Sequence, residues 1–312
     1  MARELGGVEF VQGVLPESLA PVVALVTQLG DVWFLALVVT LLYVRDGRER
    51  FAVVAARALG GLGVLYALKY YFAFPRPSAP LAPVEAVHPA IQPLYAATGF
   101  AGGYGFPSGH ALLSTVVYVS LAGAVAAGSA RRRYAAAAAL VGAVSLSRVA
   151  LGVHYLVDVL AGVAVGLAFL GATALLLRRA GRERGAVAFL VAVACAAAGV
   201  GSSGAAFDQV LLLAATLGAL TGWAAFRAAE TAGEDGRRSA VHVWTAGLAV
   251  AALFVVTVGA ADPVPGLPAA VGLAVAGLVL APILRSAERG RPVEEFLDRL
   301  GVALGRAVGR GE

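Results

Sequence analysis

The chain alternates long apolar stretches with short segments that hold most of its charged residues. A helix that crosses the hydrocarbon core of a membrane needs about 20 apolar residues, and nine stretches approach or exceed this length. They lie at about 19–44, 52–73, 109–128, 134–150, 155–177, 186–206, 209–226, 241–261 and 266–284. Because an open sheet edge cannot be satisfied in lipid, the pattern predicts an all-α, polytopic transmembrane helical bundle of about nine spans.

Two segments depart from this simple pattern. Asp31 interrupts the first stretch beside Gly30, so we expect 19–30 to form a short half-helix or re-entrant element that ends with Asp31 near water. At the other end of the chain, apolar residues recur every four positions over 292–310, with arginines between them. This spacing predicts an amphipathic helix at the inner membrane surface, or alternatively a solvated helical tail.

The composition agrees with a membrane protein and excludes a water-soluble single domain. Hydrophobic residues make up 60% of the 312 positions, and charged residues only 14%, where about 25% is usual. The lone cysteine, Cys195, cannot form an intrachain disulfide, and no Cys/His cluster has zinc spacing. We therefore expect no structural metal, no cofactor and no nucleic-acid partner.

The positions of the arginines predict the topology, because Arg and Lys near span ends tend to remain in the cytoplasm. Arginine-rich segments follow every odd-numbered stretch, at 45–50, 131–133, 178–184, 227–238 and 285–310. This pattern predicts a multi-pass protein of the cell membrane with its N-terminus outside and its C-terminus in the cytoplasm. The connections at 74–108 and 148–155 then lie on the extracytoplasmic side.

These two outer connections and the helix ends beside them concentrate the reactive side chains. The first stretch runs from Lys69 to Arg76-Pro77, the second is Pro107-Ser108-Gly109-His110, and the third runs from Ser147-Arg148 through His154 to Asp158. Taken alone, each of these residues would be an interfacial anchor, a helix cap or a structural pair. Unrelated anchors would scatter over both membrane faces, so their convergence on one face favours a functional site.

The residue types fit phosphate chemistry. Arg76 and Arg148 can each bind phosphate oxygens through two parallel hydrogen bonds, and Lys69 adds a compact charge. Pro107 precedes a helix whose first N–H groups form an anion site. No carboxylate cluster suited to a magnesium ion accompanies them, so the cations would take the place of a metal.

The histidines supply a nucleophile and an acid. His154 and Asp158 are four residues apart, which places them on one face of a helix that starts near His154. A carboxylate on one ring nitrogen fixes the tautomer and leaves the other nitrogen free to attack phosphorus. His110, on another helix, could protonate the leaving oxygen, so the set predicts a two-step reaction through a phosphohistidine.

The three stretches resemble the three signature motifs of the type 2 phosphatidic acid phosphatase family, whose site is similar to those of vanadium-dependent haloperoxidases and bacterial acid phosphatases. Every position of the family pattern matches in order, and the resemblance covers about 19–178. It implies metal-independent hydrolysis of a lipid phosphate or diphosphate at the membrane surface. The site residues that it implies are Lys69, Arg76, Ser108, Gly109 and Arg148 as phosphate binders, His110 as general acid, His154 as nucleophile and Asp158 as its orienting partner.

We therefore expect a membrane phosphatase core at 1–184, a four-span region of unknown role at 185–285 and a cytoplasmic tail at 286–312. The expected partners are membrane lipids and a substrate such as phosphatidic acid, a polyprenyl diphosphate or phosphatidylglycerol phosphate. Two alternatives stay open. The phosphohistidine could pass its phosphoryl group to an acceptor alcohol, or the extra spans could make a transporter or a partner-binding membrane module.

Overall fold

The computed structural model describes residues 6–77, 79–100 and 102–231, together with four single positions between 271 and 277. No strand occurs among these residues, so the described part of the chain is all-α as predicted. Its helices are α1 (Gly7–Val14), η1 (Glu17–Leu19), α2 (Ala20–Gln28), α3 (Val32–Asp46), α4 (Glu49–Phe72), η2 (Val84–Ala86), α5 (Gln92–Gly99), α6 (Gly109–Ala124), α7 (Ala130–Ala150), α8 (Leu156–Arg179), α9 (Arg184–Ser203) and α10 (Phe207–Thr231).

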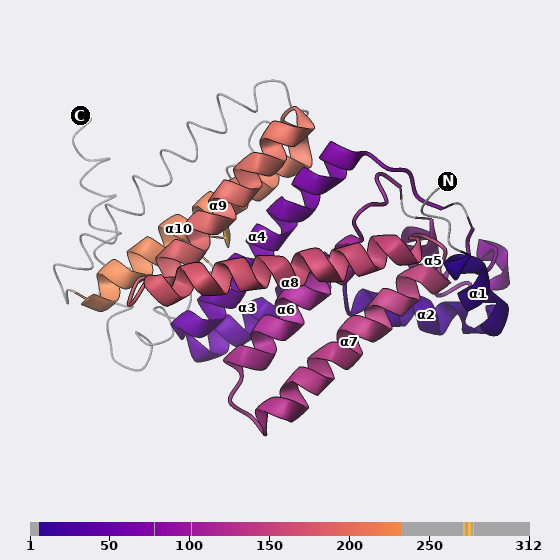
Figure 1. Cartoon of the computed structure of the whole chain (residues 1–312), viewed down its shortest axis with the longest axis horizontal. Coiled ribbons are helices and arrows are strands. Elements are labelled where there is room, and N and C mark those ends of the chain that lie inside the picture. The colour runs from indigo at the N-terminus through magenta and orange to yellow at the C-terminus, as the bar shows by residue number, and fades with distance from the viewer. Residues whose placement is uncertain are drawn as a thin grey trace, which may run out of the picture.

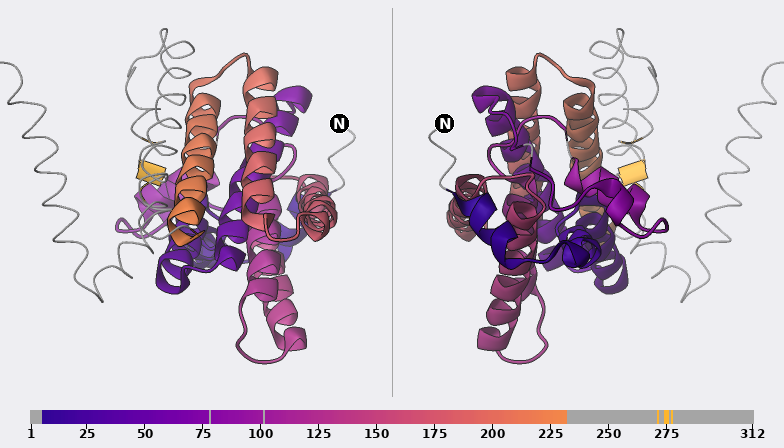
Figure 2. Two further views of the ribbon diagram at one scale, coloured as in Figure 1. Left: turned by 90° about the vertical axis from the view of Figure 1, so that its left-hand side faces the viewer. Right: turned by 90° about the vertical axis from the view of Figure 1, so that its right-hand side faces the viewer.

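The long helices pack around α4 and α6. Helix α4 lies against α9 and α6, helix α6 also contacts α7 and α8, and α10 packs on α9 (Figure 1). The views from the two sides show α9 and α10 as a pair that stands beside the rest of the bundle (Figure 2). The short helices α1, α2 and α5 gather at one end of the molecule, where α8 begins (Figure 1).

Small residues allow the closest helix contacts. A Cβ atom added at Gly63 of α4 would lie 2.5 Å from the backbone carbon of Cys195 in α9. A Cβ atom at Gly162 of α8 would lie 2.6 Å from the Ser108 carbonyl oxygen at the start of α6. Glycine is needed at both places because the facing atoms belong to backbone, which cannot rotate away as a side chain can.

The structure does not confirm nine spans. In the described part of the chain four helices are long and apolar enough to cross a membrane, namely α4, α8, α9 and α10, and the pair α1 and η1–α2, bent by 93°, gives at most a fifth. The stretch 19–44 is divided between two helices, and α6 has only 16 residues. Helix α7 is not in the group, since it carries arginines in its first and last turns. The stretches 241–261 and 266–284 and the tail at 292–310 lie outside the described residues.

The break in the first stretch lies where the sequence predicts it. Helix α2 ends at Gln28, and the chain turns through residues 29–31 before α3 begins. The Asp31 side chain caps α3 by accepting a hydrogen bond from the Trp33 N–H at 3.4 Å, and it is 31% exposed. The short helix and the break before Val32 agree with the prediction that a short helical element at 19–30 ends beside Asp31.

Candidate active site

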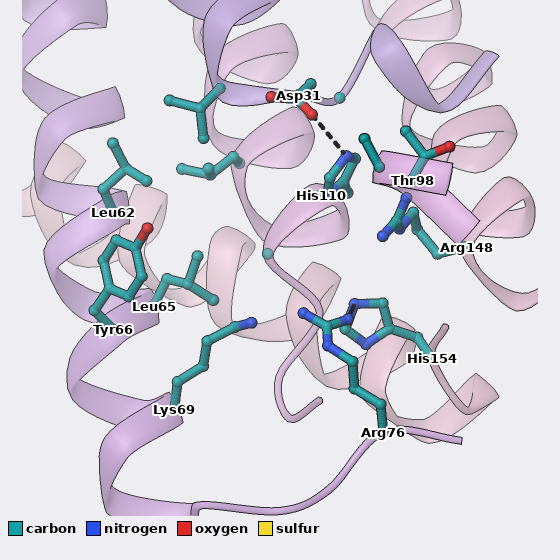
Figure 3. Close-up of a pocket in the computed structure, with 15 residues that line it drawn as sticks. Asp31, Leu62, Leu65, Tyr66, Lys69, Arg76, Thr98, His110, Arg148 and His154 are labelled. Carbon is teal, nitrogen blue, oxygen red and sulfur yellow. Dashed lines mark hydrogen bonds and ion pairs between the residues drawn. The ribbon is translucent and has the colours of Figure 1, made fainter. Parts of the chain in front are cut away.

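The three motifs meet at one end of the bundle, where helices begin or end around a cavity of about 190 Å³. Helix α4 ends beside it, α7 ends beside it, and α6 and α8 begin there. Basic and histidine side chains from these four places point toward one another (Figure 3). The basic and histidine side chains that line the cavity are Lys69, Arg76, His110, Arg148 and His154, and Asp31 lines it as well.

The first motif places two cations on opposite sides of the cavity. Lys69, in the last turn of α4, donates a hydrogen bond from Nζ to the Tyr104 carbonyl oxygen at 2.8 Å. Arg76 lies in the loop that follows and donates to the carbonyl oxygens of Gly102 at 2.9 Å and Val153 at 3.1 Å. These backbone acceptors fix both side chains while leaving further N–H donors for a ligand.

The second motif starts α6. The Ser108 hydroxyl does not cap the helix, and the Ser108 backbone N–H donates to the Asp158 carbonyl oxygen at 2.9 Å. This N–H belongs to the N-cap residue and is not available to an anion, whereas the anion site expected from the sequence concerns the N–H groups of the helix that begins at Gly109. Gly109 lines the cavity itself, and its missing Cβ leaves room for the Leu65 side chain, which such an atom would approach to 2.9 Å.

The third motif buries His154 completely and aims one of its nitrogens at Arg76. The His154 ring is 1% exposed, and its Nε2 lies 2.8 Å from Nη1 of Arg76. A guanidinium can only donate, so Nε2 accepts with its lone pair and the neutral ring carries its proton on Nδ1. The ring nitrogen that carries the lone pair is thus the one that faces Arg76.

Asp158 lies on the other side of the same ring. Its Oδ2 is 3.7 Å from Nδ1 of His154, which is too long for a hydrogen bond, and it accepts one from the Tyr155 N–H at 3.0 Å. The carboxylate therefore faces the proton-bearing nitrogen without touching it. Burial, followed by the charges of Arg76 and Arg148, holds the pKa of His154 well below its ordinary value, so the ring is neutral at pH 7.

Two residues outside the motifs, Thr27 and Asp31, lie against motif residues in the structure. Arg148 is 2% exposed and donates from Nη1 to the Thr27 hydroxyl of α2 at 2.9 Å. His110 has its Nε2 3.7 Å from Oδ2 of Asp31, just beyond α2. The charge inside an apolar stretch drew attention to Asp31, although not to this role, and nothing in the sequence pointed to Thr27.

Several buried polar atoms around the cavity have no hydrogen-bond partner within the described part of the chain. Buried polar groups are normally satisfied, and four of the exceptions belong to residues of the second and third motifs. These atoms are Ser108 Oγ, His110 Nε2, Arg148 Nε and His154 Nδ1. Ser108 and Asp158 are fully buried and do not line the cavity, whereas the other predicted site residues do.

The opposite wall of the cavity is apolar. Leu62 and Leu65 come from α4, Leu113 from α6 and Val32 from the start of α3. A pocket lined by both charged and apolar side chains suits a ligand that has both a phosphate and a hydrocarbon part.

Comparison with known proteins identifies the class of protein that this site belongs to. Residues 50–182, which contain all three motifs, match the family model described as the PAP2 superfamily. This match over part of the chain supports a type 2 phosphatidic acid phosphatase-like family member, in agreement with the resemblance of the three motifs. Neither the curated proteins nor the solved structures give a significant match to this chain.

The match to this superfamily, whose members act on phosphate-bearing lipids in general, supports a phosphoester hydrolase. Among the described residues, no group of three or more His, Cys, Asp or Glu side chains is placed to hold a metal ion.

Proposed function

We propose that the protein is an integral membrane phosphatase that hydrolyses a lipid phosphate or diphosphate through a phosphohistidine at His154. The observation that carries this proposal is the contact between His154 Nε2 and the Arg76 guanidinium, inside a cavity that also holds Lys69 and Arg148. A phosphate bound to these cations would have its phosphorus next to the nucleophilic lone pair.

The first step transfers the phosphoryl group to the enzyme. Nε2 of His154 attacks phosphorus and forms a P–N bond while the P–O bond to the leaving group breaks. His110 gives its proton to the leaving oxygen, and Asp158 stabilises the positive charge that develops on the His154 ring. Lys69, Arg76 and Arg148 bind the equatorial oxygens of the transferring group, where charge accumulates.

The second step returns the enzyme to its starting state. A water molecule attacks phosphorus, the P–N bond breaks, and inorganic phosphate is released. The neutral His110 ring takes the proton that the water gives up, because the acid of the first step becomes the base of the second.

The substrate would reach the cavity from within the membrane. The apolar side chains Leu62, Leu65 and Val32 form the wall beside which an acyl or isoprenyl chain would lie. We propose the extracytoplasmic face for this reaction. In α7 and α8 the arginine-rich end, at Arg131 and Arg178, is opposite the end at the cavity, which supports this orientation.

A phosphate-release assay across a panel of lipid phosphates and diphosphates, with EDTA present, tests the proposal. The wild-type protein should release phosphate from at least one of them, and His154→Ala should release none. His88→Ala is the matched control, since His88 is exposed and does not line the cavity. Wild-type turnover by His154→Ala would sink the mechanism.

Phosphoryl transfer to an alcohol is the second enzymatic candidate, because the same phosphohistidine could react with an acceptor in place of water. Addition of candidate alcohols would then yield a new phosphoester at the expense of free phosphate. The third candidate, a transporter or partner-binding module, rests on the extra C-terminal region and predicts binding or flux without turnover.

We propose that residues 185–285 support the core and do not take part in the chemistry. Helix α9 lies against α4 through Gly60 and Gly63, and α4 carries Lys69 into the cavity. Truncation after residue 184 would expose this face of α4, so we expect it to lower stability and activity together. Full activity of the truncated protein would show the region to be separable.

A further inference from the structure

The turn between α2 and α3 fits closely against the helices that carry the site. The Tyr118 hydroxyl of α6 donates to the Leu29 carbonyl oxygen at 2.6 Å. A Cβ atom added at Gly30 would collide with the Val144 side chain of α7 and lie 3.4 Å from the His110 ring. We call residues 27–31 the elbow; it lies outside the segment 50–182 that matches the superfamily.

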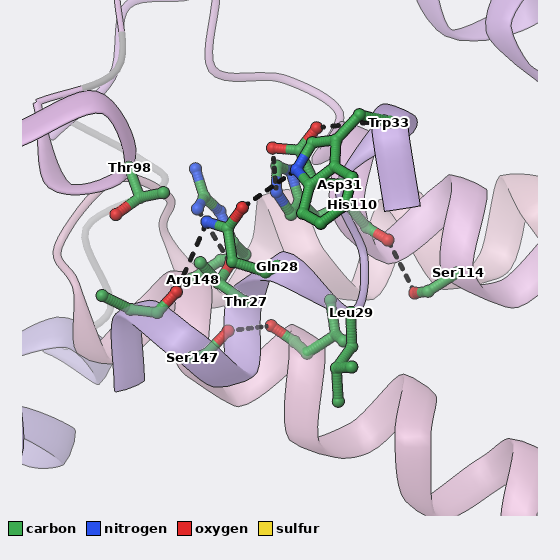
Figure 4. Close-up of polar contacts among 12 residues, drawn as sticks. Thr27, Gln28, Leu29, Asp31, Trp33, Thr98, His110, Ser114, Ser147 and Arg148 are labelled. Atoms are coloured by element: carbon green, nitrogen blue, oxygen red, sulfur yellow. Dashed lines mark hydrogen bonds and ion pairs between the residues drawn. The ribbon is translucent and has the colours of Figure 1, made fainter. Parts of the chain in front are cut away.

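The elbow presents two polar side chains to two of the motif residues. Thr27 is completely buried and accepts a hydrogen bond from Arg148, whereas Asp31 faces Nε2 of His110 (Figure 4). The distance from the Asp31 carboxylate to His110 is 3.7 Å, the same as that from Asp158 to His154. Each histidine of the site therefore has its own carboxylate.

The charges around His110 suggest that the Asp31 carboxylate affects the protonation of this ring. Lys69, Arg76, Arg148 and the His154 ring line the same cavity, and burial of the His110 ring, followed by the three cations, disfavours a positive charge on it. The proposed reaction needs His110 protonated before it can give a proton to the leaving group. Asp31 is the carboxylate among the cavity-lining residues, so it is the group able to offset the cations.

We propose that Asp31 is a positioning residue that favours the imidazolium form of His110, and that Asp31 and Thr27 of the elbow form a fourth component of the active site beside the three motifs. This inference rests on the proposed function. A carboxylate at Nε2 leaves Nδ1 of His110 to protonate the leaving oxygen, and Thr27 orients Arg148 toward the transferring phosphoryl group. No atom of the elbow forms or breaks a covalent bond.

The test compares leaving groups in Asp31→Asn. Asparagine caps a helix as well as aspartate does, so this variant removes the charge and keeps the start of α3. General acid catalysis contributes about 10²–10⁴-fold when the leaving group is a poor one. We expect Asp31→Asn to lower kcat on an alkyl lipid phosphate about 10²-fold. On p-nitrophenyl phosphate, whose leaving group needs no proton, we expect little change.

A merely structural role would lower turnover of both substrates equally, and that result would overturn the inference. Two further readouts separate the roles. In the background of His110→Ala, Asp31→Asn should cost nothing more, because both act through one proton. The alkaline limb of the pH profile of kcat should move to lower pH in Asp31→Asn. If Asp31→Asn lowers activity as much in the His110→Ala background as in the wild type, or if the alkaline limb does not move, the proposal is contradicted.

Gln28→Ala is the matched control on the same elbow. Gln28 contacts the Trp33 indole N–H at 3.1 Å and does not line the cavity, so this variant should keep wild-type ratios between the two substrates. The proposed function is tested separately by His154→Ala. An active His154→Ala would refute the function, whereas an inactive one together with an unselective Asp31→Asn would refute only the role of the elbow.

Discussion

Gly162 allows α8, which follows the third motif, to pack closely against the start of α6, which carries the second motif. Replacing Gly162 with alanine should therefore lower activity although this residue does not line the cavity. Its position in α8 faces the start of α6, where Ser108 donates its N–H to the Asp158 carbonyl oxygen. In Gly162→Ala the added Cβ would lie 2.6 Å from the Ser108 carbonyl oxygen and 3.1 Å from Cβ of Ala111. Neither atom can move away without a shift of α6 or α8.

The size of the effect follows from this geometry. Overpacking of a well-filled contact costs about 1–3 kcal/mol. A displacement of about 1 Å between catalytic groups lowers the rate about 10²-fold. Because the added methyl separates α6, which carries His110, from α8, which follows His154, we expect kcat to fall about 10²-fold and the thermal stability to decrease.

The assay is phosphate release by purified protein in detergent, paired with thermal unfolding of the same samples. Gly171→Ala is the control, since it lies in the same helix and an added Cβ there would meet nothing within 4 Å. Both variants gain the same helix propensity, so their difference isolates the contact. Equal activity of the two alanine variants would refute the reasoning that this contact positions the site.

Three further predictions concern the loop and the cavity. Gly152→Ala should lower activity by about tenfold or more, because Gly152 has φ +67° and an added Cβ would collide with the Ala79 carbonyl oxygen; wild-type turnover would contradict this. Lys69→Arg should lower kcat/KM about tenfold, since the only lysine of the chain reaches Tyr104 as a compact ammonium. Near wild-type turnover by Lys69→Arg would show that the site does not require a lysine at this position. Because the pKa of His154 is lowered, the unfolded chain binds a proton below about pH 6.5 that the folded protein does not. Stability should therefore fall between about pH 7 and pH 5 more than in His154→Asn, and equal acid sensitivity in thermal unfolding would contradict it.

The local part of the site could be predicted from the sequence because its signals are local. Helix α8 starts two residues after His154 and brings the Asp158 carboxylate to 3.7 Å from the His154 ring, and Pro107 precedes the start of another helix. The structure places Lys69, Arg76 and His154 around one cavity.

The parts that could not be predicted depend on contacts between residues far apart in the chain. Thr27 and Arg148 are 121 positions apart, and no periodicity links a threonine in an apolar helix to an arginine in another. The break at Asp31 was visible as a charge, but its partner His110 was not. The number of spans could not be predicted from the sequence either, because a run of apolar residues does not show where a turn such as 29–31 divides it.

The central claim is that His154 carries the phosphoryl group. Incubation of the protein with a lipid phosphate radiolabelled in its phosphate, followed by rapid denaturation and mass spectrometry, tests it most directly. We expect an acid-labile label on the imidazole of His154 in the wild type and no label in His154→Ala. A label on another residue, or phosphate release at the wild-type rate by His154→Ala, would contradict the account.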